Sequence, residues 1–497
     1  MPEHLRALVV ILAFATAVFV MARGSARAMA EFPGEFERRR NLWFALTLTA
    51  FLAHNFWLFL GIASVMLLVA SARDRNKIGL VLFILLAVPP FSSEIPGIGG
   101  IRYLFDIDYI KLLCLVVLIP AFAREMARHS LGHFSREIPD KLFYLFMALT
   151  VILTTREESM TEAVRSVFVL VITSVFPYAI ASRTGGGVAS LRSVFASYVA
   201  GATVLALVGV FEFSRGWLLY STLDEALQAG RGFGNYLRRG DSLRAMGTAG
   251  QAIPYGYTMA VGIMLLLGLR RFFPRKIVWF AGIGLLGLGL LASYSRGPWL
   301  GAFAGFIVFC LTGPNKWSNF AQLAFAAVAV AIVLVVTPLG EALWYRAAGV
   351  DTGTFDYREL LLRNSLETIA KYPLFGSNDF KGTEEMQELI QGQGIIDIVN
   401  TYISVALNYG LVGLLLFVGF FAAALIGAWR RMNAAAGRDA DTVDIGRSLL
   451  AALTCILVTI ATVSSITFIP FIYYVAAGLA VAYARSGRQK PPVDAPA

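Results

Sequence analysis

The amino-acid sequence predicts an all-α integral membrane protein that crosses the bilayer many times. Of its 497 residues, 57% are hydrophobic and only 15% are charged. The mean hydropathy of +0.68 lies well above the range of soluble domains. Apolar runs approaching ~20 residues, the length that crosses the hydrocarbon core of a bilayer, recur along almost the whole chain. Because lipid offers no partner for backbone N–H and C=O groups, such runs must form helices.

Taken in order, the apolar runs predict about 13 to 15 transmembrane helices. Residues 1–30 are also compatible with a cleaved signal peptide, but the many later runs favour a first helix. Residues 41–72 allow two interpretations. A tight two-pass hairpin turning near His54 and Asn55 places the N-terminus outside, whereas one long tilted helix places it inside. The predicted runs are 5–22, 41–53, 56–72, 77–91, 107–123, 142–155, 162–182, 190–213, 252–269, 276–293, 297–312, 319–337, 400–429, 446–466 and 468–484.

The distribution of arginine and lysine predicts which loops face the cytoplasm. Alternate short loops carry basic clusters, such as residues 38–40 and 270–276, and loops of this kind lie inside by the positive-inside rule. The opposite set includes both long loops, 214–251 and 339–399, so the elaborated face is predicted to lie outside. The tail, 486–497, is basic and then Pro-rich, which is typical of a disordered cytoplasmic end.

Several function classes are disfavoured. The net charge of +10 comes from basic residues scattered among short loops, a pattern of membrane orientation rather than of nucleic-acid binding. The cysteines lie inside apolar runs and are expected to be small core residues. His129 and His133 have a metal-binding spacing, but with no third ligand in view a solvated helical turn is the favoured interpretation. We therefore expect no metal and no cofactor. The cysteines are Cys114, Cys310 and Cys455.

The 214–251 loop is rich in arginine on the face where the positive-inside rule predicts few basic residues. It contains five arginines and no lysine, and arginine suits planar, multi-donor recognition of phosphate. Arg244 opens the stretch RAMGTAGQ, in which two glycines allow close backbone approach. The alternative is that a long loop escapes the charge rule and carries salt-bridged arginines. The five are Arg215, Arg231, Arg238, Arg239 and Arg244.

Arg296 lies in a very short connection, YSRGP, between two apolar runs. An arginine inside the hydrocarbon would cost ~2.5–3.5 kcal/mol, so a turn at the outer face, where Gly297 and Pro298 break the helix, is the favoured interpretation. Snorkelling of the side chain to the headgroups is the alternative. We expect Arg244 and Arg296 to bracket one dianionic group in an outward cavity beneath the 339–399 loop.

The 339–399 loop carries many carboxylates beside scattered basic residues. Its stretch YRELLLRNSLETIAKY has apolar residues at helical spacing, which predicts an amphipathic helix near the membrane surface. The helix is expected to end before Pro373. Most of these charges are expected to form a solvated face, and a carboxylate acting as a base is the alternative.

Four segments, taken in order, resemble the O-antigen ligase and polymerase superfamily of bacterial envelope enzymes. They are RAMGTAGQAIPYGYTMA, SYSRGPWLGAFAGFIV, RELLLRNSLETIAKYPLFGSNDF and VNTYISVALNYGLVGLLLFV. The resemblance covers roughly residues 190–440, which predicts this core between N-terminal helices in 1–189 and C-terminal helices in 441–485. It implies a GT-C-like membrane glycosyltransferase of the bacterial inner membrane. Such an enzyme moves a glycan from an undecaprenyl-diphosphate carrier to a glycan or lipid-linked acceptor on the periplasmic side.

The resemblance also implies site residues. Arg244 and Arg296 match arginines thought to hold the donor diphosphate, and Arg239 is a further candidate for that role. Arg363 and Asn400, in the third and fourth segments, are candidates for glycan binding.

The chain departs from the ligase pattern just before Asn400. Ligases usually carry a histidine at this position, which is Val399 here, and neither long loop contains a histidine. This departure favours a polymerase slightly over a ligase. It also makes carboxylates the candidate bases. These are Asp397, Glu384 and Glu385.

Two other function classes remain open. A lipid-linked glycan flippase or polysaccharide transporter would also expose arginines to a diphosphate, although it should line a crossing path with charges inside its helices. A non-catalytic subunit of a polysaccharide assembly complex would need no diphosphate site. The expected partners are the lipid-linked donor, the acceptor, membrane lipids and polysaccharide assembly proteins, and no nucleic acid.

Overall fold

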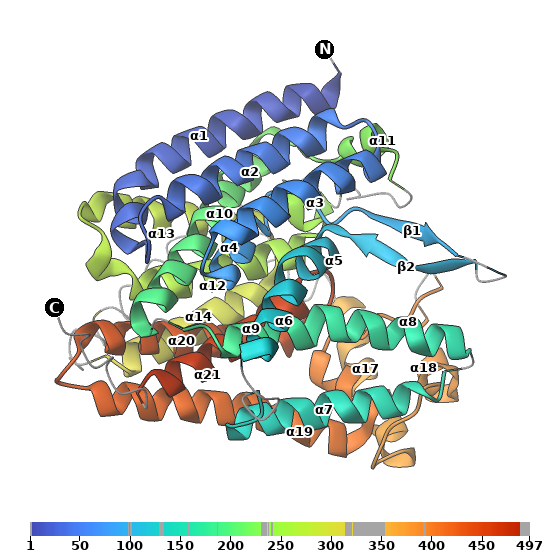
Figure 1. The fold of residues 1–497 in the computed structure, drawn as a ribbon. Helices are drawn as coiled ribbons and strands as arrows, with labels where there is room; N and C mark the ends of the chain where they lie inside the picture. Colours follow the sequence, from blue (N-terminus) through green and yellow to red (C-terminus); the bar gives the residue numbers. More distant parts are fainter. Residues whose placement is uncertain are drawn as a thin grey trace.

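The computed structural model is a bundle of long helices (Figure 1). It describes residues 2–97, 99, 102–128, 134–157, 159–185, 187–229, 236, 238–239, 242–313, 321, 353–390 and 394–487. Within these ranges, seven helices are long and apolar enough to cross a membrane, and three shorter apolar helices accompany them. The prediction of an all-α, multi-pass membrane protein is therefore confirmed.

In the first half of the chain, α1 and α4 pack against the buried helix α10, whereas α7 packs against α19 and α9 against α21. Two helices of this half continue through a single π-helical turn into the next helix. The elements are α1 (Glu3–Met29), α2 (Glu35–Leu52), α3 (Phe56–Arg73), α4 (Lys77–Ile84), α5 (Tyr109–Leu113), η1 (Cys114–Leu118), α6 (Ile119–Arg128), α7 (Ile138–Thr154), α8 (Met160–Leu170), η3 (Val171–Val175), α9 (Phe176–Ser182) and α10 (Gly187–Arg215).

The second half contains the helices that surround the candidate site. Two of them, α17 and α18, follow the segment between residues 314 and 352 and precede the longest helix, α19. The elements are α11 (Leu223–Leu227), η4 (Gly247–Ala249), α12 (Ala252–Gly268), η5 (Arg270–Phe272), α13 (Lys276–Ala292), α14 (Arg296–Leu311), α17 (Gly353–Lys371), η6 (Phe380–Gly382), α18 (Glu384–Gln387), α19 (Thr401–Ala435), α20 (Ala440–Ile460) and α21 (Ile469–Ser486).

The apolar runs predicted the helices well. Each run that falls on described residues coincides, at least in part, with a helix, and the run 319–337 lies outside them apart from residue 321. The structure agrees with a hairpin and not with one long helix at 41–72, because α2 and α3 are separate helices. His54 has a φ of +51° in the turn between them, and the Asn55 side chain caps α3 by accepting from the N–H groups of Trp57 and Leu58.

Two short β-hairpins depart from the all-α expectation. In the first, β1 (Ser92–Pro96) pairs antiparallel with β2 (Tyr103–Asp108) in the loop expected at 92–106. Asp108 then caps α5 by accepting from the N–H of Lys111, at 2.8 Å, so this helix begins later than residue 107. In the second, β3 (Arg238–Arg239) pairs with β4 (Ser242–Leu243).

The bundle has two ends, and we name them by a residue at each. The Arg244 end carries the α2–α3, α13–α14 and α20–α21 turns, and lies on the side of β1, β2, α17 and α18 in Figure 1. The N-terminus lies there too, because the indole N–H of Trp217 donates to Glu3 at 2.8 Å. The Arg39 end carries the α1–α2, α3–α4, α9–α10 and α19–α20 connections, on the opposite side of Figure 1.

Helix α14 packs directly against α20 along a row of small residues. Gly297, Gly301 and Gly305 recur at every fourth position and so share one face. A Cβ at Gly297 would lie 2.4 Å from the Thr462 hydroxyl, and one at Gly301 would lie 2.0 Å from the Thr459 hydroxyl. The glycines therefore let the two backbones approach closely.

The predicted cysteine roles hold, and the histidine pair cannot be placed. Cys114, Cys310 and Cys455 are free and buried, as expected of core residues. His129 and His133 lie outside the described residues. Among the residues that the structure does describe, no group of three or more histidines, cysteines or carboxylates could hold a metal ion.

Candidate functional site

The α13–α14 turn reverses the chain at the Arg244 end of the bundle. Tyr294 has a φ of +47°, and Ser295 is the N-cap residue of α14. Arg296 is the first residue of α14 and its side chain is exposed. The expectation that Gly297 and Pro298 break the helix is wrong, because both lie in the first turn of α14 and the reversal occurs at Tyr294 and Ser295.

Arg244 is hydrogen-bonded to this same turn. Its Nε donates to the carbonyl oxygen of Ser293 at 3.2 Å, and its second terminal nitrogen donates to the Ser295 hydroxyl at 2.8 Å. The backbone N–H of Ala245 also donates to the carbonyl of Ala292, at 3.0 Å. Burial lowers the pKa of Arg244, yet a guanidinium stays protonated at neutral pH. The structure thus brings Arg244 and Arg296 together at one turn.

A buried carboxylate, Glu212, holds the backbone that carries Arg244. One of its oxygens accepts from the N–H groups of Met246 and Gly247, at 3.1 and 2.9 Å, and the other accepts from Leu219 N–H at 3.1 Å. The residue is 1% exposed. Sequence reasoning did not single out Glu212, although an acid inside the apolar run 190–213 was a usable signal.

The α20–α21 turn forms the second wall of the site, and we call residues 462–465 the Thr462 turn. Gly297, next to Arg296, lies against the Thr462 side chain. Arg358, from α17, donates to the carbonyl oxygen of Thr462 at 3.3 Å. The structure therefore adds a third arginine to the site, which sequence reasoning had treated as one of many charges in the 339–399 loop.

Asp397 is fixed at the same turn. Its Oδ1 accepts from the Ser464 hydroxyl at 2.8 Å. Its backbone is held by Tyr357, whose hydroxyl donates to the Asp397 carbonyl at 2.9 Å and accepts from the Asp397 N–H at 3.2 Å. The side chain is exposed, so solvent or a substrate can reach it.

The other predicted bases lie elsewhere, on α18. Glu385 forms an ion pair with Lys371, and the hydrogen bond from Lys371 lowers the pKa of Glu385. A carboxylate stabilised in this way is a weaker base. Glu384 precedes it on the same short helix. The structure therefore does not bring these two carboxylates to the Thr462 turn.

Arg363 also lies apart from the cluster. Arg363 donates to Glu367 at 3.3 Å on the solvent-facing side of α17, and its side chain is 77% exposed. It is five positions from Arg358, which places it on a different side of the helix. The backbone of Arg239 pairs with Ser242 in the β3–β4 hairpin, and its side chain lies outside the described part of the chain.

The assembled cluster holds three guanidinium groups and one carboxylate on two adjoining turns. Arg244 and Arg296 belong to the α13–α14 turn, and Arg358 and Asp397 contact the Thr462 turn. Guanidinium groups donate several hydrogen bonds in a plane that matches phosphate oxygens. Such a cluster can bind a diphosphate and place a proton acceptor beside it.

A comparison with protein families gives an independent result. Residues 281–418 match the family model described as O-antigen ligase. This segment is therefore similar to the O-antigen ligase family. No curated protein matches the chain. The match supports a multi-pass, glycosyltransferase-like membrane enzyme with a ligase- or polymerase-type role in surface glycan assembly.

The O-antigen ligase segment contains most of the cluster. Arg296, Arg358 and Asp397 all fall inside it, as do three of the four segments noted in the sequence, whereas Arg244 precedes it. Arg244 is connected to the segment through its hydrogen bonds to Ser293 and Ser295.

Within the O-antigen ligase segment, Val399 and Asn400 have structural roles. Asn400 caps α19, because its side-chain oxygen accepts from the N–H groups of Tyr402 and Ile403 at 2.9 and 3.2 Å. Val399 packs against a small apolar cluster beneath α17. Because the cap uses the side-chain oxygen of Asn400, the amide N–H groups are the part of this side chain that a glycan could contact. The cluster consists of Leu361, Phe380, Met386, Leu389 and Leu407.

Proposed function

We propose that this protein transfers a glycan from an undecaprenyl-diphosphate carrier to a glycan or lipid-linked acceptor in surface polysaccharide biosynthesis. The product would be O-antigen, capsule or exopolysaccharide. The observation that carries the proposal is the convergence of Arg244, Arg296, Arg358 and Asp397 on two adjoining turns. The family match over residues 281–418 supports the same class of reaction.

The arginines would stabilise the diphosphate leaving group. When the acceptor oxygen attacks the anomeric carbon, the bond from that carbon to the diphosphate oxygen breaks, and negative charge grows on the carrier diphosphate. Fixed cationic donors stabilise this charge without having to reorganise. Arg244 is held in place by Ser293 and Ser295 before any substrate arrives.

Asp397 is the group that would accept the proton of the acceptor hydroxyl. An acceptor hydroxyl must lose a proton as its oxygen bonds to the anomeric carbon, and a positioned carboxylate can accept it. The Ser464 hydroxyl orients one Asp397 oxygen, so the other oxygen is the one that would face the acceptor.

We place the reaction at the periplasmic face of the bacterial inner membrane. This assignment is supported by charge, because the connections at the Arg39 end carry the short basic clusters that favour the cytoplasm. The candidate cluster lies at the other end of the bundle.

A polymerase is slightly favoured over a ligase. Ligases that the chain resembles usually place a histidine before the asparagine that opens the last segment. Here Val399 occupies that position and packs into an apolar cluster, and Asp397 is the ionisable group at the Thr462 turn nearest to it in sequence.

Deleting the gene and analysing both surface and lipid-linked glycans tests the proposal. Single repeat units accumulating on the carrier would indicate a missing polymerase, and long carrier-linked chains would indicate a missing ligase. Complementation with Asp397→Asn should fail, whereas Asp379→Asn, an exposed carboxylate on the segment after α17, should restore glycan. Normal surface glycan in both the Asp397→Asn and Arg244→Ala strains would overturn the proposal.

A further inference from the structure

A polar cavity lies at the Arg39 end of the bundle, far from the cluster described above. Its volume is about 490 Å³, and four parts of the chain meet around it. These are the α1–α2 connection, the α3–α4 connection, the end of α6 and the α9–α10 connection. Neither the family match nor the proposed reaction assigns any role to this cavity.

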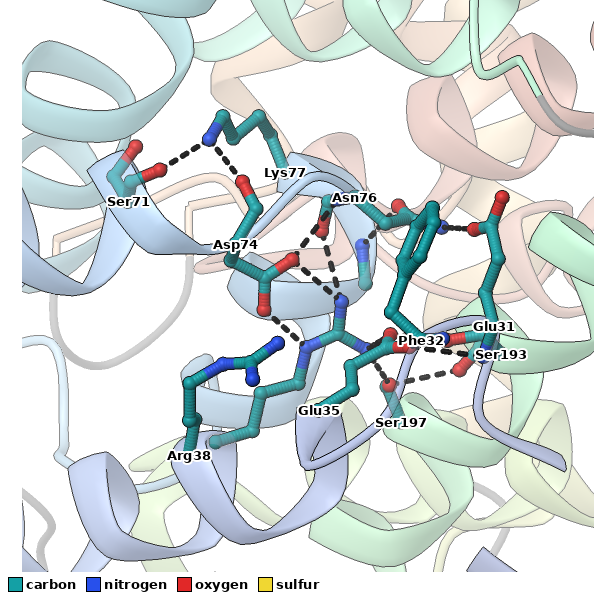
Figure 2. Close-up of polar contacts among 12 residues, drawn as sticks. Glu31, Phe32, Glu35, Arg38, Ser71, Asp74, Asn76, Lys77, Ser193 and Ser197 are labelled. Atoms are coloured by element: carbon teal, nitrogen blue, oxygen red, sulfur yellow. Dashed lines mark hydrogen bonds and ion pairs between the residues drawn. The ribbon is translucent and has the colours of Figure 1, made fainter. Parts of the chain in front are cut away.

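A buried network of ion pairs lies next to the cavity and includes Asp74, which lines it. The Arg39 guanidinium donates to both carboxylate oxygens of Asp74, at 2.8 and 2.9 Å, and to the Ser197 hydroxyl at 2.7 Å. It also forms an ion pair with Glu35, and the side chains of Arg39, Glu35 and Asp74 are at most 4% exposed. Figure 2 shows Asp74, Glu35 and Ser197 gathered around this centre. Asp74 lines the cavity, but its charge is already balanced by Arg39.

A second acid that lines the cavity, Glu31, carries less negative charge than an exposed glutamate. Burial raises the pKa of Glu31, which favours its neutral form. The Asn76 side-chain amide donates to Glu31 at 3.5 Å and to the Ser190 hydroxyl at 2.8 Å. Glu31 therefore offsets less positive charge in the cavity than an exposed glutamate would.

Of the described residues, five basic ones line the cavity against three acids, which are Glu31, Asp74 and Glu125. Three arginines are exposed on its wall, and Arg75 is partly ordered by stacking over the Phe32 ring at 4.9 Å. Lys77 donates to the carbonyl oxygens of Ser71 and Asp74 (Figure 2). Helix α4 begins at Lys77, and a helix N-terminus attracts anions. The exposed arginines are Arg75, Arg124 and Arg128.

We propose that this cavity binds the phosphate group of an anionic membrane lipid. The loops at the end of a membrane-spanning bundle lie at the level of the lipid headgroups. Basic pockets between such helix ends bind anionic headgroups, and arginine is suited to phosphate. The volume is within the range of small-ligand sites. The assignment does not depend on the proposed transferase activity.

The test uses the full-length protein in nanodiscs of phosphatidylcholine containing phosphatidylglycerol. Native mass spectrometry counts the phosphatidylglycerol molecules that remain bound after extraction into mild detergent. The variant Arg75→Ala/Arg124→Ala/Arg128→Ala should lose bound lipid by roughly tenfold or more, because each basic residue near a lipid surface adds to the attraction for anionic headgroups. The single variant Arg124→Glu, which changes one exposed side chain, should show a smaller loss.

A matched control separates a local site from general charge attraction. The variant Arg275→Ala/Arg430→Ala/Arg438→Ala removes the same charge from exposed positions at the same end, and it should retain phosphatidylglycerol. Equal retention by both triple variants, or equal loss from both, would overturn the proposal. A further arm titrates inorganic phosphate into protein held in phosphatidylcholine alone. Cavity-dependent phosphate binding without phosphatidylglycerol retention would assign the cavity to a free phosphate and also overturn it.

Discussion

Arg244 and Ser295 are joined by a 2.8 Å hydrogen bond, although they are far apart in the sequence. Ser295 is the N-cap residue of α14, so the bond connects Arg244 to the residue directly before Arg296. A second bond from Arg244, to the Ser293 carbonyl, fixes the guanidinium against the turn. By holding this turn, Arg244 orders the start of α14, which carries Arg296.

Replacing Arg244 with alanine should therefore lower glycan transfer by about 10²–10³-fold, the usual cost of losing one preorganised charge-stabilising donor. Arg244→Lys should recover little activity, because one ammonium group cannot reproduce two guanidinium bonds of fixed geometry. The measurement is surface glycan in a deletion strain that carries each variant at equal membrane abundance. Arg238→Ala, at an exposed position on β3, is the control and should restore normal glycan.

Arg358 and Arg363 provide a matched pair on α17. Arg358 reaches the Thr462 carbonyl, whereas Arg363 pairs with Glu367 in solvent. Arg358→Ala should reduce transfer by roughly 10²-fold, and Arg363→Ala should leave it within about twofold, since an exposed i,i+4 ion pair contributes little. The same glycan assay compares them. Equal effects from the two substitutions would show that the position of Arg358 at the Thr462 turn has no special importance.

Glu212 is predicted to be essential for the conformation around Arg244. Glu212→Ala removes the acceptor for three backbone N–H groups, and leaving buried donors unpaired should cost about 3 kcal/mol or more. We expect a lower melting temperature in detergent together with loss of glycan. Glu225→Ala, an exposed acid on α11, should change neither. An unchanged melting temperature for Glu212→Ala would contradict the assigned role.

The helices were predictable because their signal is local. A run of apolar residues long enough to cross lipid admits only one backbone conformation, and 187–215 or 276–292 needed no tertiary information. The β1–β2 hairpin lacked such a signal, because its strands are short and partly exposed. Its position depends on Arg165, which donates to the carbonyls of Tyr103 and Leu104 from a distant helix.

The site was predictable only in part, for a similar reason. Arg296 stood out because an arginine between two apolar runs is costly unless it has a role, and Arg244 because it opens a glycine-containing stretch of an arginine-rich loop. The choice of Arg358 over Arg363 depends on which side of α17 faces the Thr462 turn, and that orientation comes from packing between distant segments. The role of Glu212 likewise depends on a loop that folds back over the end of α10.

Gly301 and Gly284 test the close packing of α14 against α20. A Cβ at Gly301 would lie 2.0 Å from the Thr459 hydroxyl and 2.6 Å from the Cys455 carbonyl, whereas one at Gly284 would meet no atom within 4 Å. Gly301→Ala should destabilise the protein by about 1–3 kcal/mol through overpacking. Gly284→Ala should be neutral or stabilising by up to about 1 kcal/mol, because alanine favours helix. Thermal unfolding in detergent distinguishes them, and similar melting temperatures would argue against the tight helix contact.

Asp439 makes the stability of α20 depend on pH. It caps the helix by accepting from the N–H groups of Asp441 and Thr442, at 3.1 and 3.2 Å. A hydrogen bond from the Thr442 hydroxyl, with smaller contributions from these amides, lowers the pKa of Asp439. Because the folded-state pKa is lowered, the stabilisation is fully present above the unfolded value of ~3.9. It is lost as the pH falls through the folded-state pKa.

Asp439→Ala should therefore lower the free energy of unfolding by about 1 kcal/mol at neutral pH, the usual cost of losing an N-cap. The difference from the wild-type protein should shrink as the pH falls below ~4, because the wild-type carboxyl then becomes protonated as well. Melting temperatures of both proteins between pH 7 and pH 3 measure this. A constant difference across that range would mean that the side chain acts through packing and not through its charge. Since α20 ends at the Thr462 turn, a weakened start of this helix should also reduce the order of the turn that holds Arg358 and Asp397.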